Sequence, residues 1–228
     1  MLNRAARFFP ILRELKAHLA DGDSLLEVGS GYLGVGEFWR GSFVGCDVAF
    51  SLPPVKNMRA VRCSGLALPF RNSAFDAVVV SDVIEHVPTD ARKPFITEVL
   101  RVARKRVVFG YPCGKAAFAL DRKLYEDYKC RNLPAPLWLE EHMLRVFPDE
   151  HLLDDLIGGW RKKGSPNESL AFHYWMMKAE RLRFWDYLFR AALLIAPGTV
   201  ERLLRYADYE PAYRKIFVLT RCSEDAHV

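Results

Sequence analysis

The sequence predicts a doubly wound α/β fold built on a mostly parallel sheet. Short apolar runs alternate with segments of helical apolar spacing through the first half of the chain. A glycine-rich turn, Gly29-Ser30-Gly31, follows the first apolar run directly. The run 77–81 is mostly valine, which is typical of a central parallel strand covered on both faces. This βαβ rhythm indicates right-handed crossovers and a ligand site at the carboxyl ends of the strands.

The elements of the first half follow in order. Residues 4–19 have helical apolar spacing and end at Asp21-Gly22, where a turn is expected. Helices are also expected at about 34–40 and 90–104. The parallel strands are expected at 25–28, 43–47, 60–63, 77–81 and 106–110.

The second half is less regular. A short helix is expected at 149–156, and the polar segment 161–167 is expected to be turn-like. Between 169 and 204 the pattern indicates two or three amphipathic helices broken at Pro197-Gly198. A last apolar strand is expected at 216–220.

The first glycine turn alone does not identify its ligand. Gly29, Gly31 and Gly34 satisfy the G-x-G-x-x-G spacing of dinucleotide-binding turns, and Asp47 lies near the offset of the acid that binds a ribose. However, Glu27 lies two residues before the first glycine. A carboxylate there would repel a pyrophosphate and suits a ligand with a cationic amino-acid end, such as the ammonium of S-adenosylmethionine.

Further motifs specify the family. Leu68-Pro69-Phe70 is followed by Phe75-Asp76 and then by Glu85-His86-Val87. In this order, with the first turn, the motifs closely resemble those of class I S-adenosylmethionine-dependent methyltransferases, in particular the broad small-molecule group. The resemblance covers roughly residues 20–112 well and the rest loosely.

The resemblance implies the architecture of the whole chain. Residues 1–228 would form one methyltransferase domain, with the cofactor-binding core at 20–112. The sheet would be Rossmann-like and end in an antiparallel hairpin. The block at about 169–206 would then be a helical insertion before the antiparallel final strand, serving as a lid on the substrate side.

The cofactor implied by the resemblance is S-adenosylmethionine, and the first two strands would carry much of its site. Gly29, Ser30 and Gly31 would let the backbone approach it closely. Glu27 would either pair with the cofactor ammonium, directly or through water, or orient the loop. Asp47 would accept hydrogen bonds from two ribose hydroxyls. The following residue, Val48, would pack on the adenine.

The remaining cofactor contacts would come from the next two strand ends. Ser64 stands where this group usually carries an acid that accepts from the adenine amino group, and a hydroxyl accepts that bond more weakly. Gly65 and Leu66 would line the adenine. Ser81 and Asp82 would face the methionine part with their backbone, and the Asp82 side chain would either meet substrate or cap the following helix.

Methyl transfer needs an aligned acceptor, and a hydroxyl acceptor also benefits from a positioned base. His86 and His142 are the candidates. Each also has a structural interpretation: His86 would pack the start of the next helix, and His142 would be an ordinary surface histidine. No H-x-x-x-H or Cys/His spacing is present, so no metal site is expected.

Composition bounds the partners. A net charge of +5 suits an anionic partner or a generic basic face, and the absence of a compact basic run argues against nucleic-acid binding. The apolar segment 184–195 has arginines around it, so residues 181–205 would either contact a membrane or lipid-linked substrate or be buried against the sheet or a dimer partner. Oligomeric state is open. Five scattered cysteines and the lack of a signal-peptide pattern favour the cytoplasm.

These observations predict a methyltransferase that moves a methyl group from S-adenosylmethionine to a small-molecule acceptor, with oxygen favoured as the accepting atom. Two alternatives stay open at this stage. One is a protein of the same fold that binds S-adenosylmethionine without turnover. The other is an NAD-dependent oxidoreductase.

Overall fold

The structure, a computed structural model that describes residues 1–222, is built on one seven-stranded sheet. The strand order is β3-β2-β1-β4-β5-β7-β6, and β7 runs antiparallel to both of its neighbours. The strands are β1 (Leu25–Val28), β2 (Phe43–Asp47), β3 (Met58–Arg62), β4 (Phe75–Ser81), β5 (Ala103–Pro112), β6 (Trp160–Ser169) and β7 (Ala212–Arg221). The predicted Rossmann-like, mostly parallel sheet with an antiparallel final strand is confirmed.

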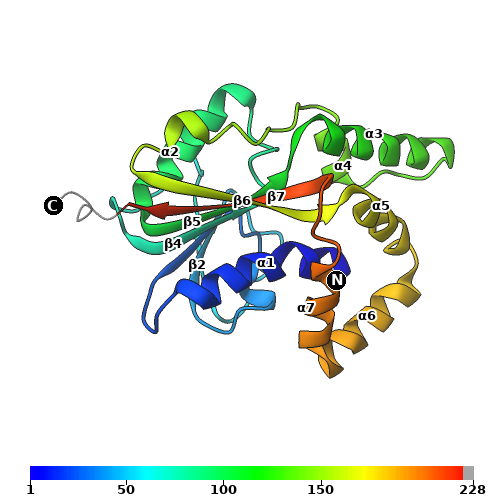
Figure 1. Cartoon of the computed structure of the whole chain (residues 1–228), viewed down its shortest axis with the longest axis horizontal. Helices are drawn as coiled ribbons and strands as arrows, with labels where there is room; N and C mark the ends of the chain where they lie inside the picture. The colour runs from blue at the N-terminus through cyan, green and yellow to red at the C-terminus, as the bar shows by residue number, and fades with distance from the viewer. Residues whose placement is uncertain (223–228) are drawn as a thin grey trace.

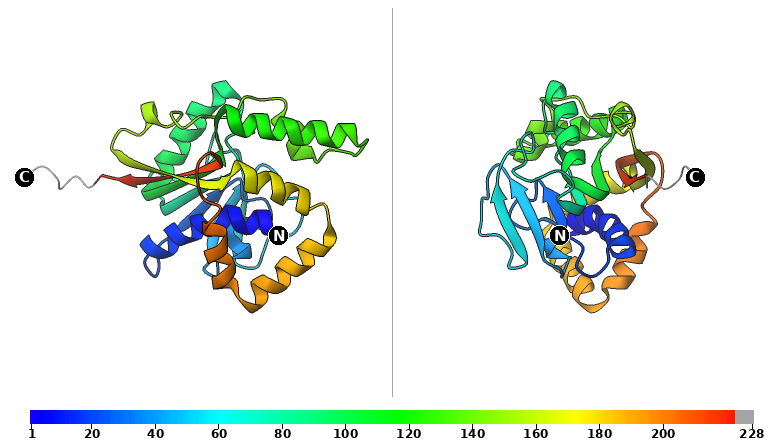
Figure 2. Two further views of the ribbon diagram at one scale, coloured as in Figure 1. Left: turned by 45° about the vertical axis from the view of Figure 1, so that its right-hand side comes forward. Right: turned by 90° about the vertical axis from the view of Figure 1, so that its left-hand side faces the viewer.

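Helices cover both faces of the sheet (Figures 1 and 2). On one face, Phe8 and Ile11 of α1 (Leu2–His18) pack against alternate side chains of the central strands, including Val79. On the other face, Phe95 and Ile96 of α2 (Arg92–Val102) pack in the cluster that contains the intervening side chains. Every residue of β4 is therefore buried, as expected of a strand with two covered faces.

The order of the strands reverses beside β1. The chain runs from β1 outward to β2 and β3, and then returns to form β4 on the other side of β1. In open α/β sheets this switch point leaves a crevice at the carboxyl ends of the two central strands. Gly29 and Asp82 lie directly after β1 and β4, so the fold positions the predicted cofactor residues at this crevice.

A helical insertion separates β6 from β7, as predicted. It consists of α5 (Leu170–Ala179), α6 (Arg183–Ile195) and α7 (Pro197–Arg205). Two methionines of α5, Met176 and Met177, are buried in a cluster with Leu124 of α3 (Gly114–Cys130) and Leu139 of α4 (Leu137–His142). In contrast, none of the α6 side chains that the structure describes is buried. The inner helix thus belongs to the core, whereas α6 is peripheral.

The polar segment at 161–167 forms most of β6, so the prediction of a turn there is wrong. Hydrogen bonding with β7 holds it in register from Trp160↔Arg221 to Ser169↔Ala212. Because β6 is the edge strand, it has room for exposed charged side chains such as Arg161 and Lys163. The periodic signal of a buried strand is therefore absent from its sequence.

Two predicted helices are shorter in the structure. Residues 34–40 contain only a 3₁₀ turn, η1 (Gly34–Glu37), and 149–156 contains η3 (Asp154–Leu156). A further 3₁₀ turn, η2 (Thr89–Ala91), precedes α2. Within residues 1–222, no helix combines the length and the apolar character needed to cross a membrane.

Candidate functional site

The glycine turn after β1 is fixed by backbone conformation and by the neighbouring strand. Gly29 and Gly31 have φ of +76° and +54°, a region that disfavours side chains. A Cβ at Gly29 would collide with Val83, whereas Gly31 faces open space. The amides of Gly29 and Ser30 donate to the carbonyl of Cys46. The turn therefore keeps one bare backbone surface open for a ligand.

Asp47 reaches back to this turn from the end of β2. Its Oδ2 accepts a 2.8 Å hydrogen bond from the Gly31 amide, and its Oδ1 accepts one of 3.3 Å from Ala49. Each carboxylate oxygen can still accept a further bond. Asp47 thus orders the glycine turn and retains the capacity that the predicted ribose contact requires.

Glu27 lies beneath the loop. It is 2% exposed, and its Oε2 accepts a 2.7 Å hydrogen bond from the Val35 amide, in space that a Cβ at Gly34 would occupy. Burial raises the pKa of Glu27 to about 7, against the lowering effects of the Val35 amide and nearby Arg7. The loop-orienting role is therefore observed, and the contact with a cofactor ammonium stays a prediction.

The predicted adenine residues lie side by side at the ends of β2 and β3. The Cys63 amide donates to the Asp47 carbonyl, which brings the segments after the two strands together. Val48 and Leu66 are 64% and 47% exposed. Ser64 is exposed and its Oγ accepts from the Leu66 amide at 3.2 Å. A Cβ at Gly65 would press on Phe95. Two exposed apolar side chains thus flank a strand-end acid, an arrangement that suits a flat base above a ribose.

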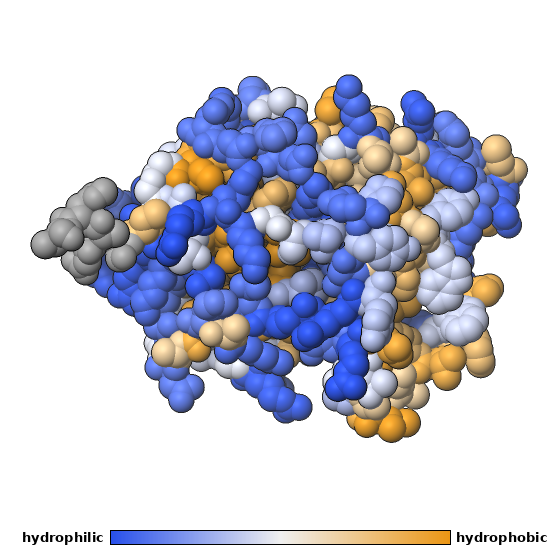
Figure 3. Space-filling view, viewed as in Figure 1, coloured by the Kyte–Doolittle hydropathy of each residue, from blue (hydrophilic) through white to orange (hydrophobic). Residues whose placement is uncertain are grey.

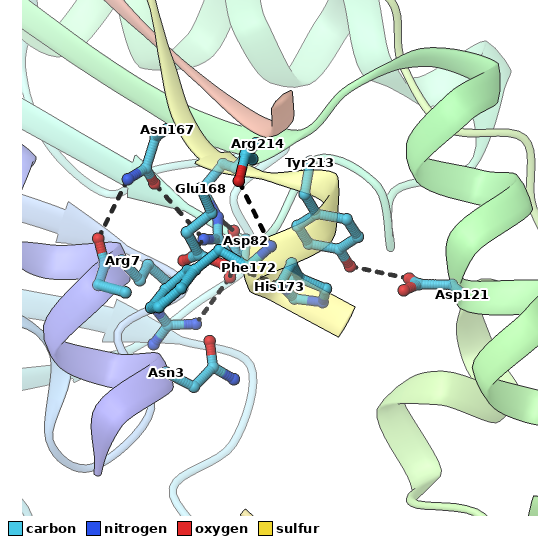
Figure 4. A network of polar contacts seen from close by, with 12 residues as sticks. Asn3, Arg7, Asp82, Asp121, Asn167, Glu168, Phe172, His173, Tyr213 and Arg214 are labelled. Carbon is cyan, nitrogen blue, oxygen red and sulfur yellow. Dashed lines mark hydrogen bonds and ion pairs between the residues drawn. The ribbon is translucent and has the colours of Figure 1, made fainter. Parts of the chain in front are cut away.

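The predicted helix-capping role of Asp82 is wrong, and its contact with substrate stays a prediction. Its carboxylate accepts hydrogen bonds from Arg214 at 2.7 and 2.8 Å and from Arg7 at 3.2 Å, so it caps no helix (Figure 4). Burial alone would raise the pKa of Asp82, but the charges of Arg214 and Arg7 lower it to about 2. Ser81 before it is buried, and its hydroxyl has no hydrogen-bond partner within residues 1–222.

Arg214 joins Asp82 to the inner end of the insertion. Besides Asp82, it pairs with the buried carboxylate of Glu168, which lies in β6 at a φ of +56° (Figure 4). The other oxygen of Glu168 is 2.7 Å from Nδ1 of His173 in α5. Sequence analysis missed this pairing. A single arginine within the apolar run 212–219 is the one signal that could have pointed to it.

The same network continues to the opposite side of α5. The rings of His173 and Tyr213 stack with centroids 3.4 Å apart. The Tyr213 hydroxyl donates to Oδ2 of Asp121 at 2.8 Å, and the same oxygen lies 2.7 Å from Nδ1 of His142. Residues of β6, β7, α3, α4 and α5 thus form one chain of polar and stacking contacts that runs from Asp82 to His142.

The two candidate histidines come together after β4. His142 is 5% exposed, so its interpretation as a surface histidine is wrong, because α4 packs it against Asp121. Its ring centroid lies 4.9 Å from that of His86. Burial, followed by the charge of His142, lowers the pKa of His86 below its usual value. The lowered pKa favours the neutral form of the His86 imidazole, which lies beyond the carboxyl end of β4.

Arg7 of α1 is a second residue that sequence analysis missed. It lies close enough to lower the pKa values of both Glu27 and Asp82, and its Nε has no hydrogen-bond partner among the described residues. In Figure 4 its side chain reaches the same space as Asn3 and Phe172. The helical spacing of residues 4–19 does not distinguish Arg7 from an arginine on the solvent-exposed face of the helix.

An open apolar cavity of about 310 Å³ lies between the insertion and the start of α1. We call it the α5–α7 cavity. Its walls come from the first residues of α1 and from α5, α6 and α7, and they include Leu2, Phe172, Trp175, Trp185, Phe189 and Leu203. Figure 3 shows hydrophobic residues gathered over the region of α6 and α7 at the lower right. Leu194 and Ile195 are 86% and 84% exposed there.

Comparison with known proteins identifies the class. Residues 26–109 match the methyltransferase domain family. The segment that contains the glycine turn and the two acids is therefore the one that family members share. Together with the fold and strand order, this match identifies residues 26–109 as a class I S-adenosylmethionine-dependent methyltransferase domain. S-adenosylmethionine is the methyl donor of this family, which excludes the NAD-dependent alternative.

A curated relative and two solved structures add detail. The chain is 33% identical over 104 residues to the tRNA (carboxymethyluridine(34)-5-O)-methyltransferase alkbh8 of Xenopus tropicalis, which is 42% of this chain but 16% of that protein. A methyltransferase solved with the Trm112 activator of Haloferax volcanii has a TM-score of 0.58 at 10% identity, covering 98% of this chain and 93% of that one. The Burkholderia thailandensis 1,6-didemethyltoxoflavin-N1-methyltransferase gives 0.55 at 13%, covering 96% and 79%.

Proposed function

We propose that the chain transfers the methyl group of S-adenosylmethionine to an oxygen atom of a small-molecule acceptor that carries an apolar part. The observation that carries the proposal is the meeting of two half-sites at one sheet edge. One half-site consists of Glu27 in β1, the glycine turn after β1 and Asp47 at the end of β2. The other is the His86–His142 pair beyond β4.

In this proposal each cofactor group has its own partner. The turn formed by Gly29, Ser30 and Gly31 lies along the amino-acid end, and Glu27 beneath it attracts the ammonium. Arg7 supplies positive charge for the carboxylate of that end, since its Nε has no partner among the described residues. Ser81 lies at the same edge, and Asp82 orients Arg7 through their 3.2 Å contact.

The nucleoside half would occupy the ends of β2 and β3. Asp47 accepts from the ribose hydroxyls through its remaining lone pairs. The base lies between Val48 and Leu66, with Gly65 allowing close approach and Ser64 accepting from the adenine amino group. The exposure of both apolar side chains supports this arrangement, because a bound base would remove their surface from water.

The chemical step needs alignment more than acid–base groups. The acceptor oxygen attacks the methyl carbon in line with the carbon–sulfur bond, and that bond breaks with its electrons moving to sulfur, which leaves S-adenosylhomocysteine. The acceptor oxygen loses its proton to the basic nitrogen atoms of the histidine pair or to water held there. The lowered pKa of His86 keeps its imidazole in the proton-accepting form near pH 7.

Two observations support the proposed acceptor. The relative from Xenopus tropicalis is by name a tRNA methyltransferase that acts at oxygen, so it supports the accepting atom and not the small-molecule class. The α5–α7 cavity is apolar and lies in the insertion that we propose as the lid on the acceptor side. The exposed apolar tip of α6, with Leu194 and Ile195, also suits contact with a lipid-linked acceptor or a membrane interface.

Calorimetric titration and turnover test the proposal together. We expect S-adenosylhomocysteine to bind to the purified protein and NAD to show no binding. Transfer of labelled methyl is then measured with apolar phenols, carboxylic acids, matched amines and unmodified tRNA. Transfer to the oxygen acceptors supports the proposal. Transfer to amines or tRNA alone would overturn the acceptor class, and binding without any transfer would favour the non-catalytic alternative.

A further inference from the structure

Three side chains that could ligate a metal ion converge beyond the carboxyl end of β4. One ligand atom each from Glu85, His86 and His142 lies within 4.8 Å of the others. The sequence gave no indication of this, because Glu85 and His86 are adjacent in the loop after β4 whereas His142 comes from α4.

Glu85 is the most unusual member. Its side chain is fully buried, and neither carboxylate oxygen has a hydrogen-bond partner within residues 1–222. The nearest cationic candidate is Nε2 of His86, 3.9 Å from Oε1. A buried carboxylate without a partner is unfavourable in a protein interior, because burial removes the water that stabilises its charge. This side chain is therefore either a protonated acid or a ligand for a cation that the three residues share.

A carboxylate lies beside Nδ1 of each histidine, and it orients His142 through a hydrogen bond. Nδ1 of His142 lies 2.7 Å from Oδ2 of Asp121, and Nδ1 of His86 lies 3.0 Å from Oε2 of Glu141. In metal sites the ligating histidine commonly places its other ring nitrogen on a carboxylate, which fixes the tautomer and leaves Nε2 free. Here the His142 ring has that hydrogen bond, and Asp121 is itself held by the Tyr213 hydroxyl. A carboxylate lies beside the His86 ring, but Nδ1 of His86 makes no hydrogen bond within residues 1–222.

We propose that Glu85, His86 and His142 form a binding site for a divalent first-row transition-metal ion of the Zn²⁺ type. Two imidazoles and one carboxylate are a donor set that such ions accept with positions left for water or substrate. Donors at 2.0–2.1 Å from one ion are separated by about 3.3–4.2 Å, so small side-chain rotations bring the three atoms onto it. His86 remains partly exposed, which leaves a route for an exchangeable ligand.

The consequence for the reaction rests on the proposed function. The site follows Asp82 by three residues, at the edge where the acceptor would meet the cofactor. An acceptor hydroxyl bound to the ion would lose its proton to water more readily, since a divalent ion lowers the pKa of a bound oxygen. The histidine pair would then act as ligands rather than as a free base.

The test measures metal binding without any methyl transfer. Chelator-treated protein, with any affinity tag removed, is titrated with Zn²⁺ by calorimetry and with Co²⁺ by visible absorption. We expect one equivalent to bind, and His86→Ala and Glu85→Gln to lose at least 100-fold in affinity. His151→Ala is the matched control, because His151 is an exposed histidine paired with acids elsewhere.

Variants of the outer carboxylates keep the test decisive if a ligand variant does not fold. Glu141→Gln and Asp121→Asn leave all three ligands in place and should weaken Zn²⁺ binding by about 10–100-fold. Saturable binding that is unchanged in His86→Ala and in Glu141→Gln would place the ion elsewhere and overturn the proposal, as would absence of saturable binding to the folded wild type. S-adenosylhomocysteine affinity, measured on the same samples, reports separately on the cofactor site.

Discussion

The proposed cofactor edge and the proposed acceptor side of this molecule are built in different ways. At the cofactor edge the polar contacts are local: Glu27 binds the amide of Val35, eight positions away, and Asp47 binds that of Gly31, sixteen away. On the acceptor side Arg214 binds Asp82 across 132 positions, and Tyr213 binds Asp121 across 92. Residues that contact one another over a short sequence separation can be recognised as a motif, whereas residues that contact one another over a long separation cannot.

The two regions also differ in how their charges are balanced. Glu27 is buried with a raised pKa and one backbone donor, so its charge is incompletely compensated in the ligand-free protein. Asp82 and Glu168 share Arg214, and the pKa of each carboxyl is lowered despite burial. Glu27 can therefore still pair with a cation. The carboxylates of Asp82 and Glu168 are already paired with Arg214. The predictions below test this difference, beginning with the largest effect.

Replacement of Arg214 should have the largest effect on stability. Arg214→Met leaves Asp82 and Glu168 buried without their shared cation, and the loss of one partner from a buried charge pair costs about 3–5 kcal/mol. The free energy of unfolding from urea titration measures this loss. Arg161→Met, on the exposed face of β6, should change it by less than about 0.5 kcal/mol. Equal effects of the two variants would show that the network does not support the fold.

Removal of the outer insertion should abolish transfer and spare cofactor binding. The buried methionines show that α5 belongs to the core, so the replacement covers 181–206, with a flexible linker of roughly ten residues that spans about 17 Å. S-adenosylhomocysteine affinity should stay within about tenfold, or roughly 1.4 kcal/mol. Methyl transfer to an apolar acceptor should fall below detection.

A surface variant separates the lid from a membrane contact. Leu194→Ser combined with Ile195→Ser changes only strongly exposed side chains at the tip of α6. Transfer to a water-soluble acceptor should persist in this variant. Binding to anionic vesicles, measured by sedimentation, should decrease if α6 contacts a membrane interface. For the deletion variant described above, a folded protein that lacks 181–206 and keeps full methyl-transfer activity would refute the proposal that the insertion is a lid.

Asp47→Ala should weaken S-adenosylhomocysteine binding by about 1.5–3 kcal/mol, which is the scale for losing hydrogen bonds to a charged group. Part of this loss comes from the glycine turn, because Asp47 also accepts from the Gly31 amide. Calorimetry measures the affinity, and Asp47→Asn serves as a control that retains an acceptor for that amide. Unchanged affinity with a lower melting temperature would make Asp47 a turn residue only.

Glu27 should couple cofactor binding to pH. Because its pKa is raised to about 7 in the ligand-free protein, the carboxyl is protonated below that value and pairs poorly with an ammonium. Affinity for S-adenosylhomocysteine should therefore rise roughly tenfold from pH 6 to pH 8. Glu27→Gln should bind more weakly and show a flat profile. A wild-type affinity that falls with increasing pH would contradict the proposed contact.

The raised pKa of Glu27 also makes the free energy of unfolding of the ligand-free protein depend on pH. A carboxyl whose pKa is raised in the folded state stabilises that state at low pH, and this contribution is lost as the pH rises from the unfolded value to about 7. The free energy of unfolding of wild type relative to Glu27→Gln should therefore decrease over this interval. Urea titrations at a series of pH values measure it.

Ser64→Asp should have the smallest effect. It restores the acid usual at this position in the resembled group, so S-adenosylhomocysteine affinity should stay the same or increase several-fold, up to about 1.4 kcal/mol. Ser64 is exposed and accepts only from the nearby Leu66 amide, so the folded state should tolerate the change. A large loss of affinity would show that the 63–66 loop does not face the adenine.

The sequence alone determined the parallel half of the fold and the identity of the cofactor. Apolar runs, a valine-rich central strand and a glycine turn depend on neighbours within a few positions, because strand burial and positive φ are local requirements. Glu27, Asp47 and Val48 could be placed for the same reason. The helices of the insertion were also predictable from their spacing, although their division into a core helix and a peripheral one was not.

The tertiary structure decided the rest. The sequence of β6 has no alternation of apolar and polar residues, because β6 is an edge strand with exposed side chains. Only its pairing with β7 identifies it as a strand. The partner of Asp82 and the burial of His142 depend on Arg214, Glu168 and Asp121, which lie on elements that meet only after the chain has folded. Long-range charge pairing is specified by geometry in three dimensions rather than by spacing along the chain. For that reason the convergence of Glu85, His86 and His142 became visible only when α4 was placed beside the end of β4.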